Sequence, residues 1–160
     1  MFPPETAHYL SLNALETLSF LHFKEARPIV SDNIEILGLD FQNRLGLAAG
    51  MDKNADYINS LSYLGFGFLE LGTLTPRAQS GNIKPRLFRL RDERSLINNM
   101  GFNNKGIEHA VLKIKNSMSK AVIGLSIGKN QETPLEKALE DYLFCLEKAY
   151  PVCDYVAVNI

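Results

Sequence analysis

The sequence predicts an α/β fold: a (β/α)8 barrel of which about the first four strands are present, preceded by a short helical segment. Four short apolar runs alternate with segments of helical periodicity. The runs are apolar at consecutive positions, which is typical of parallel strands covered on both faces. A complete barrel takes ~250 residues, and four strands in 160 residues, with a helical preface and a hairpin insertion, are about half of one. We therefore expect an N-terminal helical segment at residues 1–37 and the first half of a barrel at residues 38–160.

The opening stretch PPETAHYLSLNALETLSFLHF, residues 3–23, has the periodicity of an amphipathic helix. Apolar residues recur at helical spacing: Leu10, Ala14, Leu18 and Leu21. Others widen this face: Leu12, Leu15, Phe20 and Phe23. Polar residues interrupt the stretch too often for the ~20 mostly apolar residues of a spanning helix. Two interpretations stay open, of which we favour the first: the helix packs on the body of the protein, or it lies on a membrane surface.

The four apolar runs predict strands at residues 45–50, 68–73, 121–128 and 155–160. Two hairpins are predicted as well. The stretch IEILGLDFQN, residues 34–43, turns at Gly38. The stretch KPRLFRLRDERSLINNM, residues 84–100, turns near Asp92 and is inserted between the second strand and its helix.

Three helices connect the predicted strands, and each has one apolar face. The first face consists of Ile58, Leu61 and Leu64, up to Gly65. The second consists of Ile107, Val111 and Ile114. The third consists of Leu135, Leu139, Tyr142 and Leu146, up to Pro151. A capping box of Thr133 and Glu136, with Pro134 at the first helical position, is predicted to begin the third helix.

Charge and cysteine content exclude several classes of function. A formal charge of −1 provides no basic field to hold nucleic acid. Cys145 and Cys153 form no CxxC motif and have no histidine cluster nearby, so we predict buried or half-buried thiols and no metal site. Neither a secretion signal nor an import sequence is recognisable, and exposure to the cytosol is the default expectation.

In parallel α/β folds the chemistry lies past the carboxyl ends of the strands. The polar residues expected there are Asp52, Lys53, Asn54, Thr73, Thr75, Lys129, Asn130 and Asn159. Lys53 is either a ligand of the site or a solvated lysine of the first turn. A carboxamide at Asn159, in an apolar strand, needs a partner or costs ~1–3 kcal/mol. Glu70, in the middle of the second strand, is expected to pair with a lysine or arginine of the sheet.

Five stretches together resemble family 2 dihydroorotate dehydrogenase: GLAAGMDKN, GFGFLELGTLTPRAQSGNIKPRLFRL, LINNMGFNNKG, IGKNQETPLEKALEDY and YVAVNI. They cover residues 39–160 in order and at the family's spacing. The opening PPETAHYLSLNALETL is similar to the helical segment of the membrane-associated, quinone-using branch. The resemblance implies an FMN-containing barrel that oxidises dihydroorotate to orotate in pyrimidine (UMP) biosynthesis and passes the electrons to a quinone.

The resemblance also implies roles for individual residues. The predicted substrate-binding residues are Lys53, Asn98, Asn99, Met100, Gly101, Phe102 and Asn159. The predicted FMN-binding residues are Ala49, Gly50, Met51, Asp52, Lys53, Thr73, Ser126 and Asn159. Carboxamides suit orotate because its flat ring presents alternating donors and acceptors. Asn103 and Asn104 are expected to cap the next helix.

The sequence departs from the family pattern at two of these positions, since Ser126 replaces a usual asparagine and Asn99 a usual arginine. The family's catalytic base is a serine expected two positions beyond Ile160, and the barrel's phosphate-binding loops follow its seventh and eighth strands. We therefore expect no catalytic residue within the chain, and expect the chain alone to be an incomplete and inactive part of the enzyme.

Two functions follow as alternatives. In the first, the chain is the N-terminal half of the dehydrogenase, peripheral on the cytoplasmic side of a bacterial inner membrane. The N-terminal helix would then face the membrane surface and the quinone. In the second, it is a noncatalytic half-barrel module that associates with itself or another chain through open barrel edges. An open-sheet nucleotide-binding module is a weaker alternative, because no GxGxxG follows the first strand.

Overall fold

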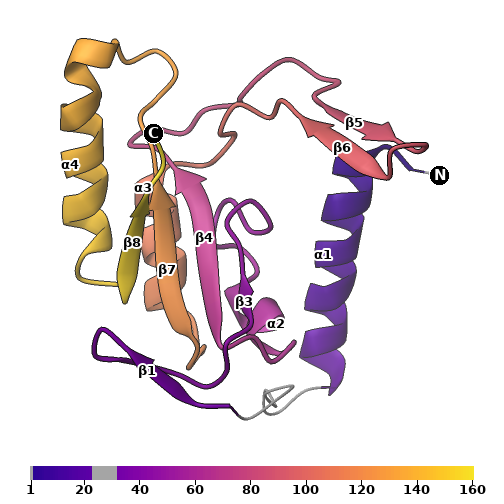
Figure 1. Ribbon diagram of the computed structural model, residues 1–160, viewed down its shortest axis with the longest axis vertical. Helices are drawn as coiled ribbons and strands as arrows, with labels where there is room; N and C mark the ends of the chain where they lie inside the picture. Colours follow the sequence, from indigo (N-terminus) through magenta and orange to yellow (C-terminus); the bar gives the residue numbers. More distant parts are fainter. Residues whose placement is uncertain (1, 23–31) are drawn as a thin grey trace.

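Four parallel strands in the order β3-β4-β7-β8 form the central sheet of the computed structural model, which describes residues 2–22 and 32–160 (Figure 1). The strands are β3 (Gly46–Leu47), β4 (Phe68–Leu74), β7 (Val122–Ile127) and β8 (Tyr155–Val158). Each lies within, or one residue beyond, a predicted run, and every pair is parallel. The prediction of a parallel α/β sheet is therefore confirmed, and in the described residues the sheet stays open, with β3 and β8 at its edges.

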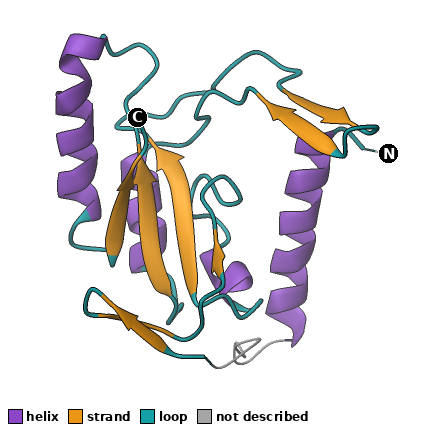
Figure 2. Ribbon diagram, viewed as in Figure 1, coloured by secondary structure: helices purple, strands orange, loops and turns teal. Residues whose placement is uncertain are grey.

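Three helices connect these strands: α2 (Ile58–Ser62), α3 (Ile107–Lys115) and α4 (Ala138–Ala149) (Figure 2). The core lies between the sheet and these helices, where Leu71, Leu125 and Ile107 are fully buried. The predicted face of α3 is confirmed, because Ile107 and Ile114 are buried and Val111 packs against them. In α2 the prediction holds for Ile58 and Leu61, whereas Leu64 lies past the helix end and is exposed.

The predicted start and face of the third helix are wrong. A short 3-10 turn, η1 (Leu135–Lys137), precedes α4, and no side-chain cap is present at Pro134 or Lys137. The helix buries Asp141, Cys145 and Ala149, which are spaced by four residues. These small or hydrogen-bonded residues permit close packing on β7 and α3. The predicted leucines face away: Leu139 is 66% exposed, and Leu135 and Leu146 are exposed too, which leaves Tyr142 as the half-buried member.

Both predicted hairpins are present. Strands β1 (Ile34–Ile36) and β2 (Leu39–Phe41) pair across a turn in which Leu37 and Gly38 have φ of 53° and 78°. Positive φ at both central residues is the mark of the tight turns that suit hairpin twist. Strands β5 (Leu87–Leu90) and β6 (Ser95–Asn98) form the second hairpin, and Asp92 lies in its turn.

Hairpin β1-β2 lies against the sheet at the amino ends of its strands (Figure 1). There the Phe41 ring meets Phe68 edge to face, and Phe68 meets Tyr155 in the same way. The Tyr155 hydroxyl donates to the Glu70 carboxylate at 3.1 Å, so the basic partner expected for Glu70 is replaced by a phenol. Burial and this carboxylate raise the pKa of Tyr155.

Helix α1 (Pro4–His22) packs on the body through one face, as predicted. Leu12 is buried there, with Leu15 beside it. Of the predicted apolar residues, Leu12 and Leu15 thus contact the body, whereas Leu10, Ala14, Leu18 and Phe20 are exposed. The Leu21 side chain and Phe23, which belong to the predicted helix, lie outside the residues described. In the described part of the chain, neither α1 nor any other helix is long and apolar enough to cross a membrane.

The expected division of the chain at residues 37 and 38 lies in the turn of hairpin β1-β2. Both thiols are free, with Cys145 buried and Cys153 half-buried, as predicted. Burial raises the pKa of Cys145 to about 12 and that of Cys153 to about 11. Such thiols are poor nucleophiles near neutral pH. Among the described residues, no group of three His, Cys, Asp or Glu side chains could hold a metal ion.

Candidate functional site

A cavity of about 430 Å³ lies at the carboxyl ends of β4 and β8. The loop after β3 and the segment that follows β6 complete its wall. Twelve residues line it: Ala49, Gly50, Lys53, Gly72, Thr73, Asn82, Asn98, Asn99, Met100, Gly101, Phe102 and Asn159. Lys53, Asn98 and Asn159 are distant in sequence, and the structure brings them to one place. All residues predicted to bind substrate or FMN are in this lining except Met51, Asp52 and Ser126. Four other polar residues expected at the strand ends lie outside it: Asn54, Thr75, Lys129 and Asn130.

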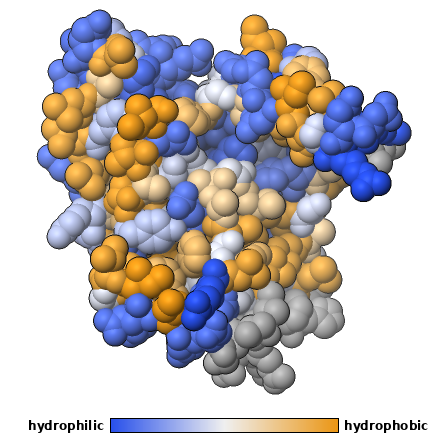
Figure 3. All heavy atoms as spheres, viewed as in Figure 1, coloured by the Kyte–Doolittle hydropathy of each residue, from blue (hydrophilic) through white to orange (hydrophobic). Residues whose placement is uncertain are grey.

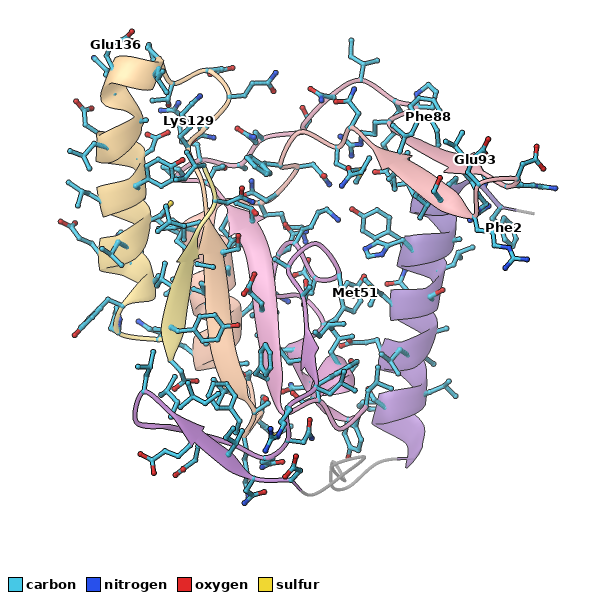
Figure 4. The ribbon with its side chains drawn as sticks, in the orientation of Figure 1. Phe2, Met51, Phe88, Glu93, Lys129 and Glu136 are labelled. Atoms are coloured by element: carbon cyan, nitrogen blue, oxygen red, sulfur yellow. The ribbon has the colours of Figure 1, made fainter. Side chains whose placement is uncertain are left out.

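Asp52 organises the loop that follows β3. Its side chain is 2% exposed and accepts hydrogen bonds from the backbone N–H groups of Asn54, Asp56 and Tyr57 at 2.7–3.2 Å. Burial raises its pKa, and these donors oppose the rise. Asp52 therefore shapes the cavity wall from behind. Met51 is exposed, on the side of the loop that faces α1 (Figure 4).

Lys53 brings the positive charge of this loop to the cavity. Its amine is half-buried and donates to the Gly50 carbonyl at 2.5 Å. Burial lowers the pKa of Lys53, the Glu5 carboxylate opposes this, and the Arg86 guanidinium adds to it. Burial and the charge of Lys53 also lower the pKa of His8 on α1. A partly dehydrated ammonium attracts an anionic ligand more strongly than a solvated one.

A row of hydrogen-bonded side chains, with Thr73 between Ser126 and Asn159, joins the ends of three adjacent strands. The Asn159 Nδ2 group donates to Thr73 Oγ1 at 2.9 Å, and Thr73 Oγ1 and Ser126 Oγ are also 2.9 Å apart. Asn159 thus has the partner that its position requires. Ser126 is buried behind Thr73, so it supports the cavity wall from outside the lining.

The run from Asn98 to Asn104 contains carboxamides of two kinds. Asn104 is buried and fully used: its Oδ1 accepts from the N–H of Gly106, the residue before α3, and its Nδ2 donates to Thr75 and Phe102. Its predicted capping role is wrong, because Gly106 is the N-cap of α3 and no side chain of the described residues caps the helix; Asn104 instead holds the loop that precedes it. Asn98 and Asn99 are exposed at the cavity.

Asn103 differs from its expected capping role. It is 8% exposed, and its Oδ1 atom has no hydrogen-bond partner among the described residues. A buried acceptor without a donor is rare in folded proteins and indicates a missing ligand or water. The expected capping role of Asn103 is therefore wrong, and Asn103 also lies outside the residues that line the cavity.

Sequence reasoning also missed two lining residues, Asn82 and Gly72. Gly72 lies inside the second predicted strand, just before the expected ligand contact at Thr73. Asn82 follows no strand, because a long connection carries it back over the cavity. The stretch QSGN around it, rich in turn residues, was the available signal.

An open parallel sheet with a cavity at its carboxyl edge defines the general class, an α/β protein whose candidate site lies at its strand ends. The family model described as dihydroorotate dehydrogenase matches residues 32–160. The chain belongs to that family.

Two relatives named "Dihydroorotate dehydrogenase (quinone)" come from Nitrosospira multiformis, 54% identical over 157 residues, and Saccharophagus degradans, 51% identical over 158 residues. Each match covers 98% of this chain, and 45% and 47% of the respective relative. A crystal structure of the Eimeria tenella enzyme in complex with ferulenol is 34% identical, with a TM-score of 0.83. It is matched over 98% of this chain and 43% of its own. The chain thus spans about half the length of its curated relatives.

The half-buried amine of Lys53 leads to a prediction about the pH at which it titrates. Because the pKa of Lys53 lies below its ordinary 10.5 in the folded chain, folding disfavours the charged amine. That cost is full below the folded pKa and disappears as pH rises toward 10.5. We expect competitive acetylation, read by mass spectrometry, to show half-maximal reactivity of Lys53 below pH 10.5. Glu5→Gln should lower that pH further, whereas Lys53 titrating at or above 10.5 would contradict the burial.

Proposed function

We propose that the chain supplies the amino-terminal half of an enzyme that oxidises dihydroorotate to orotate with FMN and a quinone acceptor, in pyrimidine biosynthesis. Membership of the dihydroorotate dehydrogenase family supports this. The observation that carries the proposal is the convergence of Lys53, Asn98 and Asn159 on one cavity at the strand ends.

The substrate side of the cavity is assigned to Lys53, to Asn159 and to the segment from Asn98 to Phe102. The Lys53 ammonium suits a carboxylate, and exposed carboxamides match the ring's donors and acceptors without adding charge. Asn99 provides a neutral group here in place of the family's usual arginine. The charge of the substrate is therefore met by Lys53 in this half of the site.

The cofactor side is assigned to Ala49, Gly50, Thr73 and Asn159, with Asp52 and Ser126 supporting that wall from behind, whereas Met51 lies on the side of the loop that faces α1. The residues fit a flat cofactor because Gly50 has φ of 100° with nothing within 4 Å of the position a Cβ would take, so a ring can approach the backbone there. FMN, when bound, supplies the hydride acceptor. Residues of this chain orient the ring and hold charge beside it.

Removal of hydride also requires a base for the proton on the neighbouring carbon. The resemblance assigns this role to a serine beyond Ile160, and the phosphate-binding loops to the second half of the barrel. We assign no catalytic residue within the 160 residues. Their contribution is binding, orientation and electrostatics.

A fusion protein tests this proposal. Joining the chain to the carboxyl-terminal half of the Nitrosospira multiformis relative should give flavin absorbance and dihydroorotate-dependent quinone reduction. The 160-residue chain alone should give neither. Within the fusion, Asn98→Ala should lower kcat/KM roughly tenfold or more, because the substrate loses a hydrogen-bonding partner. Asn116→Ala, at an exposed helix end, is the control. A fusion that binds flavin and keeps full activity without Asn98 would contradict the site.

We also propose that α1 meets the membrane surface and the quinone, which places the protein on the cytoplasmic side of a bacterial inner membrane. The exposed apolar residues Leu10, Leu18 and Phe20 support this. They lie on a helix whose Leu12 packs in the core, so they are free to contact a membrane surface.

Vesicle sedimentation checks this surface. Leu18→Glu should reduce binding to phosphatidylethanolamine and phosphatidylglycerol vesicles several-fold, because it puts a charge on the apolar face. Leu112→Glu, an equally exposed leucine on α3, should leave binding unchanged. Equal loss in both variants would mean that α1 has no special role.

A second candidate, a noncatalytic module that associates through open edges, is favoured by the α4 surface. Leu139, Leu143 and Leu146 are exposed beside edge strand β8, and hydrophobic residues appear along this side in Figure 3. The two candidates differ in the behaviour of the isolated chain. Light scattering should show a discrete oligomer, dissociated by Leu143→Glu, if the chain is such a module. A heterogeneous or aggregating sample is expected from an incomplete enzyme.

A further inference from the structure

Helix α1 is joined to the cavity wall through a buried arginine. Glu5, in the first turn of α1, holds Arg86 with both carboxylate oxygens: Nη2 to Oε1 is 2.7 Å and Nε to Oε2 is 3.3 Å. Arg86 is 5% exposed and immediately precedes β5, beside which the start of α1 lies (Figure 1). This two-pronged geometry fixes the plane of the guanidinium as well as its position.

The same guanidinium holds the connection that runs over the cavity. Arg86 Nη1 donates to the carbonyls of Ser80 and Asn82, at 2.5 and 3.0 Å. Gly81 between them has φ of 72°, and a Cβ there would meet the Met100 carbonyl and Arg86 Nη1. The connection is therefore packed against the guanidinium without spare room. A shift of Arg86 must move this backbone.

Asn82 carries the link into the cavity lining. Its Nδ2 group donates to both oxygens of Asn99, the carbonyl at 3.1 Å and Oδ1 at 2.9 Å. The Asn99 N–H in turn donates to the Arg86 carbonyl at 2.9 Å. With Oδ1 engaged, the Asn99 Nδ2 group has no hydrogen-bond partner among the described residues and is available to a ligand. Both carboxamides line the cavity.

We propose that Arg86 is a positioning residue, which transmits the placement of α1 through Glu5 to the cavity wall formed by Asn82 and Asn99. Affinity for a planar pyrimidine carboxylate then depends on how α1 sits on the body. The inference rests on the proposed function for the identity of the ligand, and on the contacts above for the coupling.

In the described part of the chain, no neighbouring group replaces the Glu5 carboxylate as the charge partner of Arg86. An unpaired guanidinium in a buried position is strongly unfavourable, so Arg86 must turn toward water or recruit other acceptors. Lys84 also lies 3.2 Å from Glu5, but it is largely exposed and contributes little to the pair. The carbonyls of Ser80 and Asn82 would lose their donor as Arg86 moves. The Asn82–Asn99 contact would loosen next.

The test compares two isosteric variants of α1 in the fusion protein described above, with the unchanged fusion as the wild type. Glu5→Gln removes the charge that holds Arg86. Glu16→Gln is the matched control: Glu16 accepts from Ser60 Oγ at 2.6 Å and so anchors α1 to α2, with no contact to the cavity wall. Nuclear magnetic resonance of the side-chain amide groups should show shifted or broadened Asn82 and Asn99 signals in Glu5→Gln alone. The dissociation constant for orotate should rise roughly tenfold in that variant and stay within about twofold in the control.

A conservative variant guards against a folding defect. Glu5→Asp keeps the charge on a shorter side chain, so the same signals should move in the same direction by less. Unchanged Asn82 and Asn99 signals in Glu5→Gln, or equal changes in Glu16→Gln, would overturn the proposal. If the unchanged fusion binds no orotate, the proposed ligand is wrong, and the amide signals still decide whether the coupling exists.

Discussion

Parallel pairing of β4 with β7, and of β7 with β8, is the constraint on which the candidate site depends. Parallel strands end at the same edge of a sheet, so residues that follow different strands become neighbours there. Thr73, Ser126 and Asn159 show this directly, since their side chains form one hydrogen-bonded row across three strands. That row is a rigid support for the polar groups above it. If the middle strand, β7, ran antiparallel, its carboxyl end with Ser126 would lie at the opposite edge of the sheet.

Hydrogen-bond satisfaction separates the carboxamides and carboxylates that build the fold from those that remain for a ligand. Asn104 and Asn130 are buried and fully engaged, each holding several loop groups around Thr75. Asp52 does the same for the loop after β3. Asn103 is equally buried but has an unused oxygen, and Asn99 keeps a free amide. Residue type alone does not make this distinction, because the same side chain suits both tasks.

The sequence was sufficient for the strands and their parallel direction, because the period of the apolar runs and the strand order determine these features. The convergence of Lys53 and Asn159 with Asn98 was predicted through the family resemblance, since Asn98 ends a hairpin strand outside the parallel sheet. The sequence was insufficient where the buried face of a helix, or the position of a loop residue, depends on the surface against which it packs. The α4 leucines have helical spacing, yet the helix buries Asp141, Cys145 and Ala149, since close packing on the sheet favours small side chains. Asn82 could not be placed, because its position depends on Arg86 and a long connection. No pattern of neighbouring residues in the sequence predicts the contact between Arg86 and Asn82.

The attachment of α1 follows a different physical rule from the core. Beside Leu12 and Leu15, which pack on the core, its contacts with the body are polar: Asn13 with Tyr57, Glu16 with Ser60 and Glu5 with Arg86. Each such bond adds only about 1 kcal/mol, more for the charged pair, so the helix is held in a defined position without large apolar burial. Its leucines on the outer face therefore stay available for another apolar environment. A segment attached in this way can move as a unit at modest free-energy cost. Among its polar attachment points, Arg86 alone also holds the connection that carries Asn82, so a movement of the start of α1 acts on the wall that holds Asn82 and Asn99.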